Sequence, residues 1–182
     1  MIIFSLFYEI CRLDTEDFDN EGHWHEESFH AEWSKSLGTA GGLRTFKSTF
    51  CNNPHQIINL AGGTESDQVL VCLQQKQRRK QRLEGKKMVV MGFCCYKVKN
   101  PSAETLAEKI NWPKCKSVFT SKYAPRRDIT QKFTIDMKKW GPGQFVIIPT
   151  AHKPGQEAKF FCRIFVEQDH PDSDASVSED ED

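Results

Sequence analysis

The sequence predicts an all-β fold, an antiparallel β-sandwich of about eight strands. Three observations carry this prediction. Apolar and polar residues alternate with a period of two in short runs, the runs recur about every ten residues, and Gly, Pro and Asn pairs stand between them. In the last run, Phe160, Cys162, Ile164 and Val166 share one face of a strand, which we expect to face the core.

Nine runs fit this pattern, and each is bounded by residues that favour turns. In chain order they are residues 4–13, 23–33, 55–60, 68–75, 87–98, 115–120, 129–137, 143–150 and 158–168. The main corners are Gly41-Gly42, Asn53-Pro54, Gly62-Gly63, Gly141-Pro142-Gly143 and Pro154-Gly155. One segment, residues 102–110, has helical character, and Ser102 is its candidate N-cap.

The length of 182 residues suits one domain with a tail. We expect the β-sandwich to occupy residues 1–167 and the acidic, weakly apolar residues 168–182 to be disordered. The tail contains Ser173, Ser176 and Ser178 among acidic residues, so we expect that an acid-directed kinase could phosphorylate them. The alternative is a tail that only keeps the chain soluble.

Charge and cysteine content exclude several classes of protein. The chain has 25 basic and 25 acidic side chains, so it is not a polyanion binder as a whole. Most of the seven cysteines lie inside apolar runs, which favours a reducing, cytoplasmic location. The first ten residues are apolar but contain Glu9, have no basic start and offer no cleavage site, so we expect neither a signal peptide nor a membrane span.

The strongest charge feature lies between two apolar runs, where residues 76–87 hold seven cations and one acid, Glu84. We expect this run to project as a basic lobe or hairpin tip. It would attract anionic lipid at about 1 kcal/mol per cation, and an acidic protein surface is the alternative. Nucleic acid is not expected, because no aromatic residues alternate with the cations. The candidate contact residues are Lys76, Arg78, Arg79, Lys80 and Arg82.

An acidic loop before the second run is a candidate calcium site. Its carboxylates, Asp14, Asp17, Asp19 and Glu21, are the oxygen ligands that calcium prefers. Ser28 stands where a helix-loop-helix calcium loop needs its bidentate glutamate, so a solvated acidic loop remains the alternative.

Two other groups of residues are candidates for a catalytic cysteine and for a zinc site. Cys51 lies near His55, the pair that a cysteine hydrolase would need, but the other cysteines lie inside strands, where a buried thiol behaves as a small hydrophobe, and an active site is not expected. His23 and His25 share one face of a strand and His30 points to the other, so a zinc site is disfavoured.

The order of motifs resembles domain III of calpain large subunits, over about residues 4–167. Trp33, the turn Thr39-Ala40-Gly41-Gly42 and the corner Asn53-Pro54 are similar to the start of that domain. The runs "LVCLQQKQRRKQRLEG", "MGFCCYKV" and "GPGQFVIIPTAHKPGQEAKFFCRIFVE" follow in the family's order.

The resemblance implies a β-sandwich related in shape to the C-two class of calcium- and lipid-responsive domains. It implies a non-catalytic domain that links and regulates a calcium-dependent cysteine protease, with the calpain protease core or other calpain domains and anionic phospholipid membranes as partners. No catalytic Cys, His and Asn segment of the family is recognised, so the sequence predicts no enzyme activity of its own. A stand-alone adaptor and a fragment of an active calpain endopeptidase are the alternatives.

One departure from the family concerns regulation. The family usually carries a long acidic loop after the Asn-Pro strand, whereas this chain has a short one with Glu65 and Asp67. We therefore expect that any electrostatic switch of this kind would depend on the acidic residues between Asp14 and Glu21.

Overall fold

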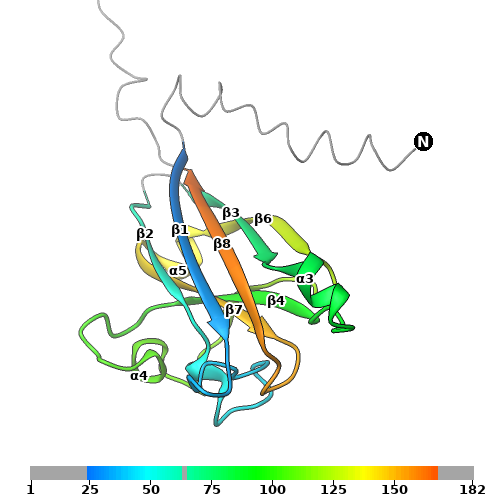
Figure 1. The fold of residues 1–182 in the computed structure, drawn as a ribbon. Coiled ribbons are helices and arrows are strands. Elements are labelled where there is room, and N and C mark those ends of the chain that lie inside the picture. Colours follow the sequence, from blue (N-terminus) through cyan, green and yellow to red (C-terminus); the bar gives the residue numbers. More distant parts are fainter. Residues whose placement is uncertain (1–23, 63–64, 168–182) are drawn as a thin grey trace, which may run out of the picture.

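The computed structural model describes residues 24–62 and 65–167, which form two antiparallel four-stranded sheets. The first sheet consists, in spatial order, of β1 (Trp24–Trp33), β8 (Ala158–Glu167), β3 (Ser66–Gln75) and β6 (Asp128–Asp136). The second consists of β2 (Gln56–Leu60), β7 (Gly143–Ala151), β4 (Met91–Lys97) and β5 (Ser117–Thr120). Figure 1 shows β1 and β8 crossing in front of β7 and β4. The predicted antiparallel β-sandwich is confirmed.

Eight of the nine predicted strands correspond to observed strands. The alternating pattern is a good predictor here because the apolar residues of each strand share one face, and that face packs against the core. The largest difference is in β4, which begins at Met91 rather than at residue 87. The run at residues 4–13 and the tail at 168–182 lie outside the described residues.

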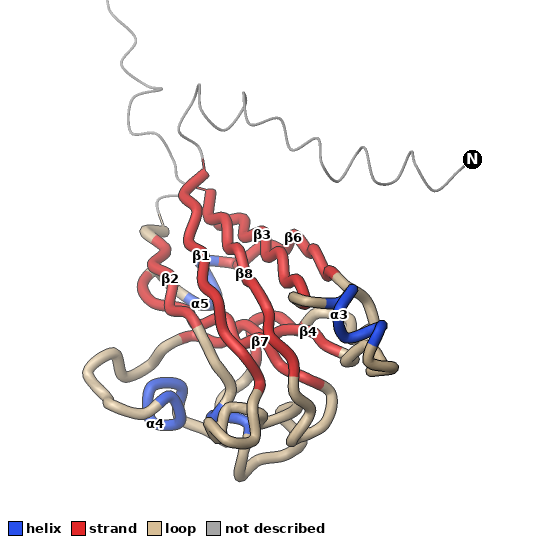
Figure 2. The backbone as a smooth tube through the Cα atoms, viewed as in Figure 1, coloured by secondary structure: helices blue, strands red, loops and turns tan. Residues whose placement is uncertain are grey.

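Short helices occupy the connections and are drawn in blue in Figure 2. They are η1 (Phe50–Asn52), α3 (Arg78–Leu83), α4 (Leu106–Ile110) and α5 (Met137–Trp140). No described helix has the length and apolar character needed to cross a bilayer.

Two expectations about the connections were wrong in part. The helix expected at 102–110 begins at Leu106, and its N-cap is Thr105 rather than Ser102. The Thr105 hydroxyl accepts from the Glu108 backbone N–H while the Glu108 carboxylate accepts from Thr105, a capping box that Ser102 has no matching residue to form. Of the two forms expected for the basic run, a lobe or a hairpin tip, the hairpin tip is wrong, because β3 and β4 belong to different sheets and the run contains helix α3.

The main core fills the space between the sheets. On β8, Phe160, Cys162, Ile164 and Val166 all face it, as the alternation predicts. Trp33 at the end of β1 is buried there and its indole N–H donates to the Pro149 carbonyl on β7, with 3.2 Å between nitrogen and oxygen. This hydrogen bond joins the two sheets across the core.

A second apolar cluster covers the outer face of the β2-β7-β4-β5 sheet. Phe50 of η1, Tyr96 of β4 and Ile110 of α4 are fully buried in it. The Trp112 ring stacks on Phe50 with 4.5 Å between the ring centroids. This cluster therefore places η1 and α4 against the sheet, on the side of the sandwich away from α3 in Figure 1.

The buried amide of Asn53 holds the Thr-Ala-Gly-Gly turn against the Asn-Pro corner. Its oxygen accepts from the Gly41 N–H at 3.2 Å, and its nitrogen donates to the carbonyls of Gly42 at 2.9 Å and Phe50 at 2.8 Å. A Cβ on Gly41 would lie 2.2 Å from the Thr49 carbonyl oxygen, so the backbones approach closely only because residue 41 is glycine.

Asn53→Ala is expected to lower the free energy of unfolding by about 3 kcal/mol, because it leaves the buried Gly41 N–H and Gly42 carbonyl without this partner. Urea unfolding followed by tryptophan fluorescence measures the change. Asn52→Ala is the control, since Asn52 is exposed and adjacent. Equal stability of the two variants would contradict this role of Asn53.

Candidate functional site

The basic segment, residues 76–87, links β3 to β4 and carries α3 at the edge of the sandwich (Figure 1). Its seven cations are Lys76, Arg78, Arg79, Lys80, Arg82, Lys86 and Lys87. A peptide segment so rich in like charge has no apolar face with which to fold alone, so its conformation depends on how the rest of the domain holds it.

The side chain of Gln75, the last residue of β3, holds the base of the basic segment. Gln75 is 2% exposed. Its amide nitrogen donates to the carbonyls of Val89 at 2.7 Å and Arg126 at 2.8 Å, and its oxygen accepts from the Val89 N–H at 3.2 Å. Both ends of the basic segment, at Gln75 and Val89, are thereby tied together and to the loop before β6.

The backbone of α3 ends in a Schellman motif. Gly85 has a φ of 69°, its N–H donates to the Arg82 carbonyl at 3.1 Å, and the Lys86 N–H donates to the Gln81 carbonyl at 2.8 Å. Glycine at this left-handed position avoids the strain of a Cβ, and the two hydrogen bonds satisfy carbonyls that the helix leaves open. The short helix therefore has a defined end although it has no buried residue.

Side chains of α3 divide between two faces. Arg78 and Gln81 are half-buried, and the Arg78 guanidinium donates to the Gln81 side-chain oxygen at 2.6 Å and to the Lys87 carbonyl at 3.4 Å. Arg79, Lys80 and Arg82 are exposed. This division follows from helical spacing, because residues three apart lie on one face.

Lys76 contacts the first sheet rather than solvent alone. Its ammonium lies 3.5 Å from His30 Nε2 and 5.5 Å from the centroid of the Phe161 ring. Three of the five predicted contact residues, Arg79, Lys80 and Arg82, are thus exposed on α3. Lys76 and Arg78 instead have partners within the domain.

The flanking acid, Glu84, pairs with Lys86, which follows α3 in the chain. Its carboxylate lies 2.9 Å from the Lys86 ammonium, and the hydrogen bond from Lys86 lowers the pKa of Glu84 below its usual value. Both side chains are exposed, so the pair contributes little to stability.

Beside α3 lies a solvent-open cavity of about 510 Å³ that the sequence did not predict. Gln77, Gln81, Lys86 and Lys87 line one side, and the ends of β1 and β8 with the turn after β1 line the other. Its wall carries both signs of charge, including Glu32 and Lys159, whose charged atoms are 3.7 Å apart.

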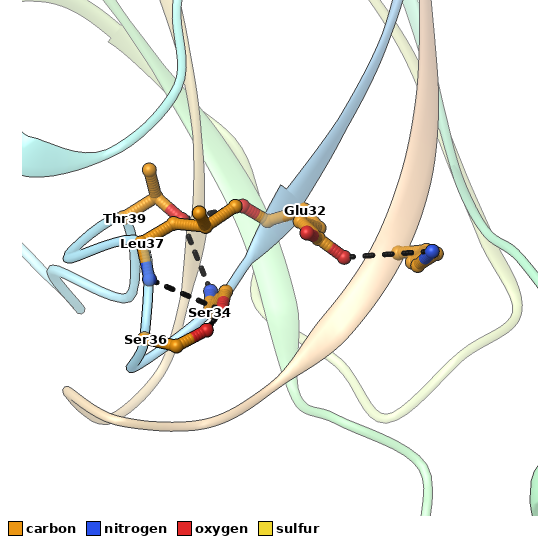
Figure 3. Close-up of polar contacts among 6 residues, drawn as sticks. Glu32, Ser34, Ser36, Leu37 and Thr39 are labelled. Atoms are coloured by element: carbon orange, nitrogen blue, oxygen red, sulfur yellow. Dashed lines mark hydrogen bonds and ion pairs between the residues drawn. The ribbon is translucent and has the colours of Figure 1, made fainter.

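The turn next to this cavity is held by its own hydroxyls (Figure 3). Thr39 donates its hydroxyl to the Glu32 carbonyl at 2.7 Å and accepts from the Ser34 N–H at 3.0 Å. The Ser34 and Ser36 hydroxyls are 2.9 Å apart. The conformation of the turn is therefore fixed locally, and this wall of the cavity is preformed.

The two weaker candidate sites are the Cys51–His55 pair and the histidines in and before β1. Burial, with a smaller contribution from Cys115, raises the pKa of the Cys51 thiol to about 11, whereas a nucleophilic cysteine needs a lowered pKa. The nearby His55 ring has its Nδ1 3.3 Å from the Asn53 carbonyl oxygen. His25 and His30 lie on opposite faces of β1, which pairs with β8 without a bulge, and His23 lies outside the described residues.

Several predicted sites cannot be located in the structure. Asp14, Asp17, Asp19 and Glu21 lie outside the described residues, as do Ser173, Ser176 and Ser178. Within residues 24–62 and 65–167, no group of three or more His, Cys, Asp or Glu side chains is arranged to hold a metal ion. Of the two acids in the shortened loop, Glu65 pairs with Lys138 and Asp67 is buried in β3.

Gln75→Leu is expected to open the basic segment without changing its charge, because it leaves the buried polar groups of Val89 and the Arg126 carbonyl without this amide. We expect tryptic cleavage within residues 78–87 to be about tenfold faster. Gln74→Leu is the control, since Gln74 faces away from the core on the same strand. Unchanged cleavage, with wild-type global stability, would show that Gln75 does not hold the segment.

Comparison with known proteins gives the family. The family model described as "Calpain large subunit, domain III" matches residues 21–165. Calpain-A of Drosophila melanogaster is 33% identical over 172 residues, which covers 87% of this chain and 20% of the relative. Human Calpain-2 catalytic subunit is 31% identical over 172 residues, which covers 88% of this chain and 24% of the relative.

The chain thus spans about a fifth to a quarter of the length of these curated relatives. Among solved structures, one titled "Bacillus endospore appendages form a novel family of disulfide-linked pili" is 10% identical to this chain, with a TM-score of 0.25. The match covers 81% of this chain and 90% of that chain, and a likeness this weak carries no argument. The family match covers most of the sandwich, and the chain belongs to the calpain large subunit domain III family.

Proposed function

We propose that this chain is a non-catalytic regulatory domain of a calpain-type cysteine protease, and that α3 contacts anionic phospholipid at a membrane surface. The observation that carries the lipid contact is the exposure of Arg79, Lys80 and Arg82 on a short helix whose segment is held at its base by Gln75. The proposed location is the cytoplasm, with peripheral attachment to membranes.

The energy available from this surface is modest and additive. Each cation near an anionic bilayer contributes about 1 kcal/mol, so Arg79, Lys80 and Arg82 together contribute about 3 kcal/mol. Exposed Lys87 lies close to them in sequence and adds to the same positive potential, whereas the charge of Lys86 is offset by its ion pair with Glu84. Binding of this kind is reversible and weakens with salt, which suits a domain that regulates rather than anchors.

The regulatory role rests on the family. A calpain protease core and other calpain domains are the proposed partners. In this proposal the protease core, and not the described domain, carries out proteolysis. The raised pKa of the Cys51 thiol supports a binding role rather than cysteine chemistry by the described domain itself.

Calcium enters the proposal through Asp14, Asp17, Asp19 and Glu21, whose oxygens suit that ion. Comparing vesicle binding in calcium and in chelator tests this part. Binding that strengthens with calcium in the wild type, and no longer does so after Asp17→Asn and Asp19→Asn, supports calcium regulation. Equal binding in both conditions removes calcium from the proposal.

The second candidate function is an adaptor that docks an acidic protein surface. The observation that favours it is the cavity of mixed charge beside α3, which offers both donors and acceptors to a peptide. Phosphorylation at Ser173, Ser176 or Ser178 would add negative charge to an already acidic tail, and we place it under this alternative.

Reversing three exposed cations, as Arg79→Glu, Lys80→Glu and Arg82→Glu, is expected to weaken binding to phosphatidylserine-containing vesicles about a hundredfold or more. The reason is the lost attraction of about 1 kcal/mol per cation and the added repulsion. Vesicle sedimentation at two salt concentrations measures the effect.

Its matched control reverses the same charge elsewhere, as Lys99→Glu, Lys114→Glu and Lys116→Glu, all three of which are exposed. We expect this variant to bind vesicles more strongly than the α3 variant by at least tenfold. If both variants lose binding equally, net charge rather than α3 governs the interaction and the proposed contact is wrong.

A further inference from the structure

Leu83 is the one apolar residue of α3, and 85% of it is exposed. Two other large hydrophobic residues are exposed among the described residues, Leu37 at 62% and Phe46 at 39%. A single exposed leucine is ordinary on a protein surface. Its surroundings make this one informative.

Helical spacing puts Leu83 on the same side as Arg79 and Lys80, four and three residues before it. These two cations and the neighbouring Arg82 are exposed, whereas Arg78 and Gln81 face the sandwich. The outward surface of α3 therefore holds one apolar side chain among exposed cations, and the acid next to it in sequence, Glu84, is paired with Lys86.

The base of this surface is rigid. Gln75 ties both ends of the segment to the core, Arg78 fixes the inward face through Gln81, and the Schellman hydrogen bonds of Gly85 and Lys86 follow directly after Leu83. Leu83 thus projects from a fixed support and loses little conformational freedom when it is buried by a partner.

We infer that Leu83 inserts into the apolar boundary of an anionic bilayer while the cations around it contact the headgroups. This inference rests on the lipid contact proposed above and assigns it a residue that supplies apolar burial. A bilayer is the partner that fits, because its phosphates and its hydrocarbon lie within one long side chain of each other, and Lys and Arg stems bridge that depth. Charge complementarity selects anionic lipid over neutral lipid.

The test compares wild type with Leu83→Ala in flotation with phosphatidylcholine vesicles that contain phosphatidylserine. Each methylene withdrawn from hydrocarbon changes partition roughly fourfold, so partial insertion of Leu83 predicts about a tenfold loss of binding. The ratio between the two proteins stays the same as salt is raised, because apolar burial is not screened although the total binding falls. Leu37→Ala, in the turn after β1, is the matched control and binds as wild type does.

A second measurement reports depth directly. Leu83→Trp is expected to gain quenching by brominated lipid over the wild-type signal, whereas Leu37→Trp gains none. If Leu83→Ala binds within twofold of wild type and Leu83→Trp gains no quenching, insertion is wrong while the charge contact stands. If the wild type binds no vesicle of any composition, the proposed lipid contact itself fails, and insertion with it.

Discussion

The buried side-chain amide of Gln75 is the contact on which the candidate site depends. It makes three hydrogen bonds, two to Val89 and one to Arg126, at the point where β3 leaves the core. A buried amide left without these partners costs about 1 to 3 kcal/mol for each unpaired group, so the surrounding backbone is held in one arrangement. Because the segment after Gln75 carries seven cations and no buried residue in its helix, the domain rather than the segment determines where α3 lies.

The contacts that stabilise the sandwich lie away from α3. Trp33 joins the sheets through the Pro149 carbonyl, and Asn53 binds the Thr-Ala-Gly-Gly turn to the corner before β2. These contacts lie in the core and at its rim, whereas α3 lies at an edge where substitutions change charge without removing core packing. The division separates residues that fold the domain from those proposed to bind lipid.

The features that the sequence predicts correctly are those that depend on neighbouring residues, and the features that it misses depend on contacts between distant parts of the chain. Strands such as β8 are predictable because the alternation of Phe160, Cys162, Ile164 and Val166 is read directly as one buried face. The helix α3 was not predicted, since it has no apolar period and is held by tertiary contacts of Gln75 and Arg78. A signal for Gln75 was present, because it is a polar residue that continues the inward face of Val69, Val71 and Leu73 at the end of the strand, as Asp67 does at the start. The cavity beside α3 required knowing that the ends of β1 and β8 lie next to it, which no local pattern contains.

The most direct test of the account is hydrogen–deuterium exchange of the full chain with and without vesicles that contain phosphatidylserine. The account predicts that binding slows exchange in peptides covering residues 77–86, where the amides of Gln81, Glu84, Gly85 and Lys86 already have carbonyl partners. Peptides from residues 99–116, the segment that contains α4 and also carries exposed lysines, are predicted to remain unchanged. Slowed exchange in that loop or on β1, with residues 77–86 unaffected, would contradict the assignment of α3 as the contact surface.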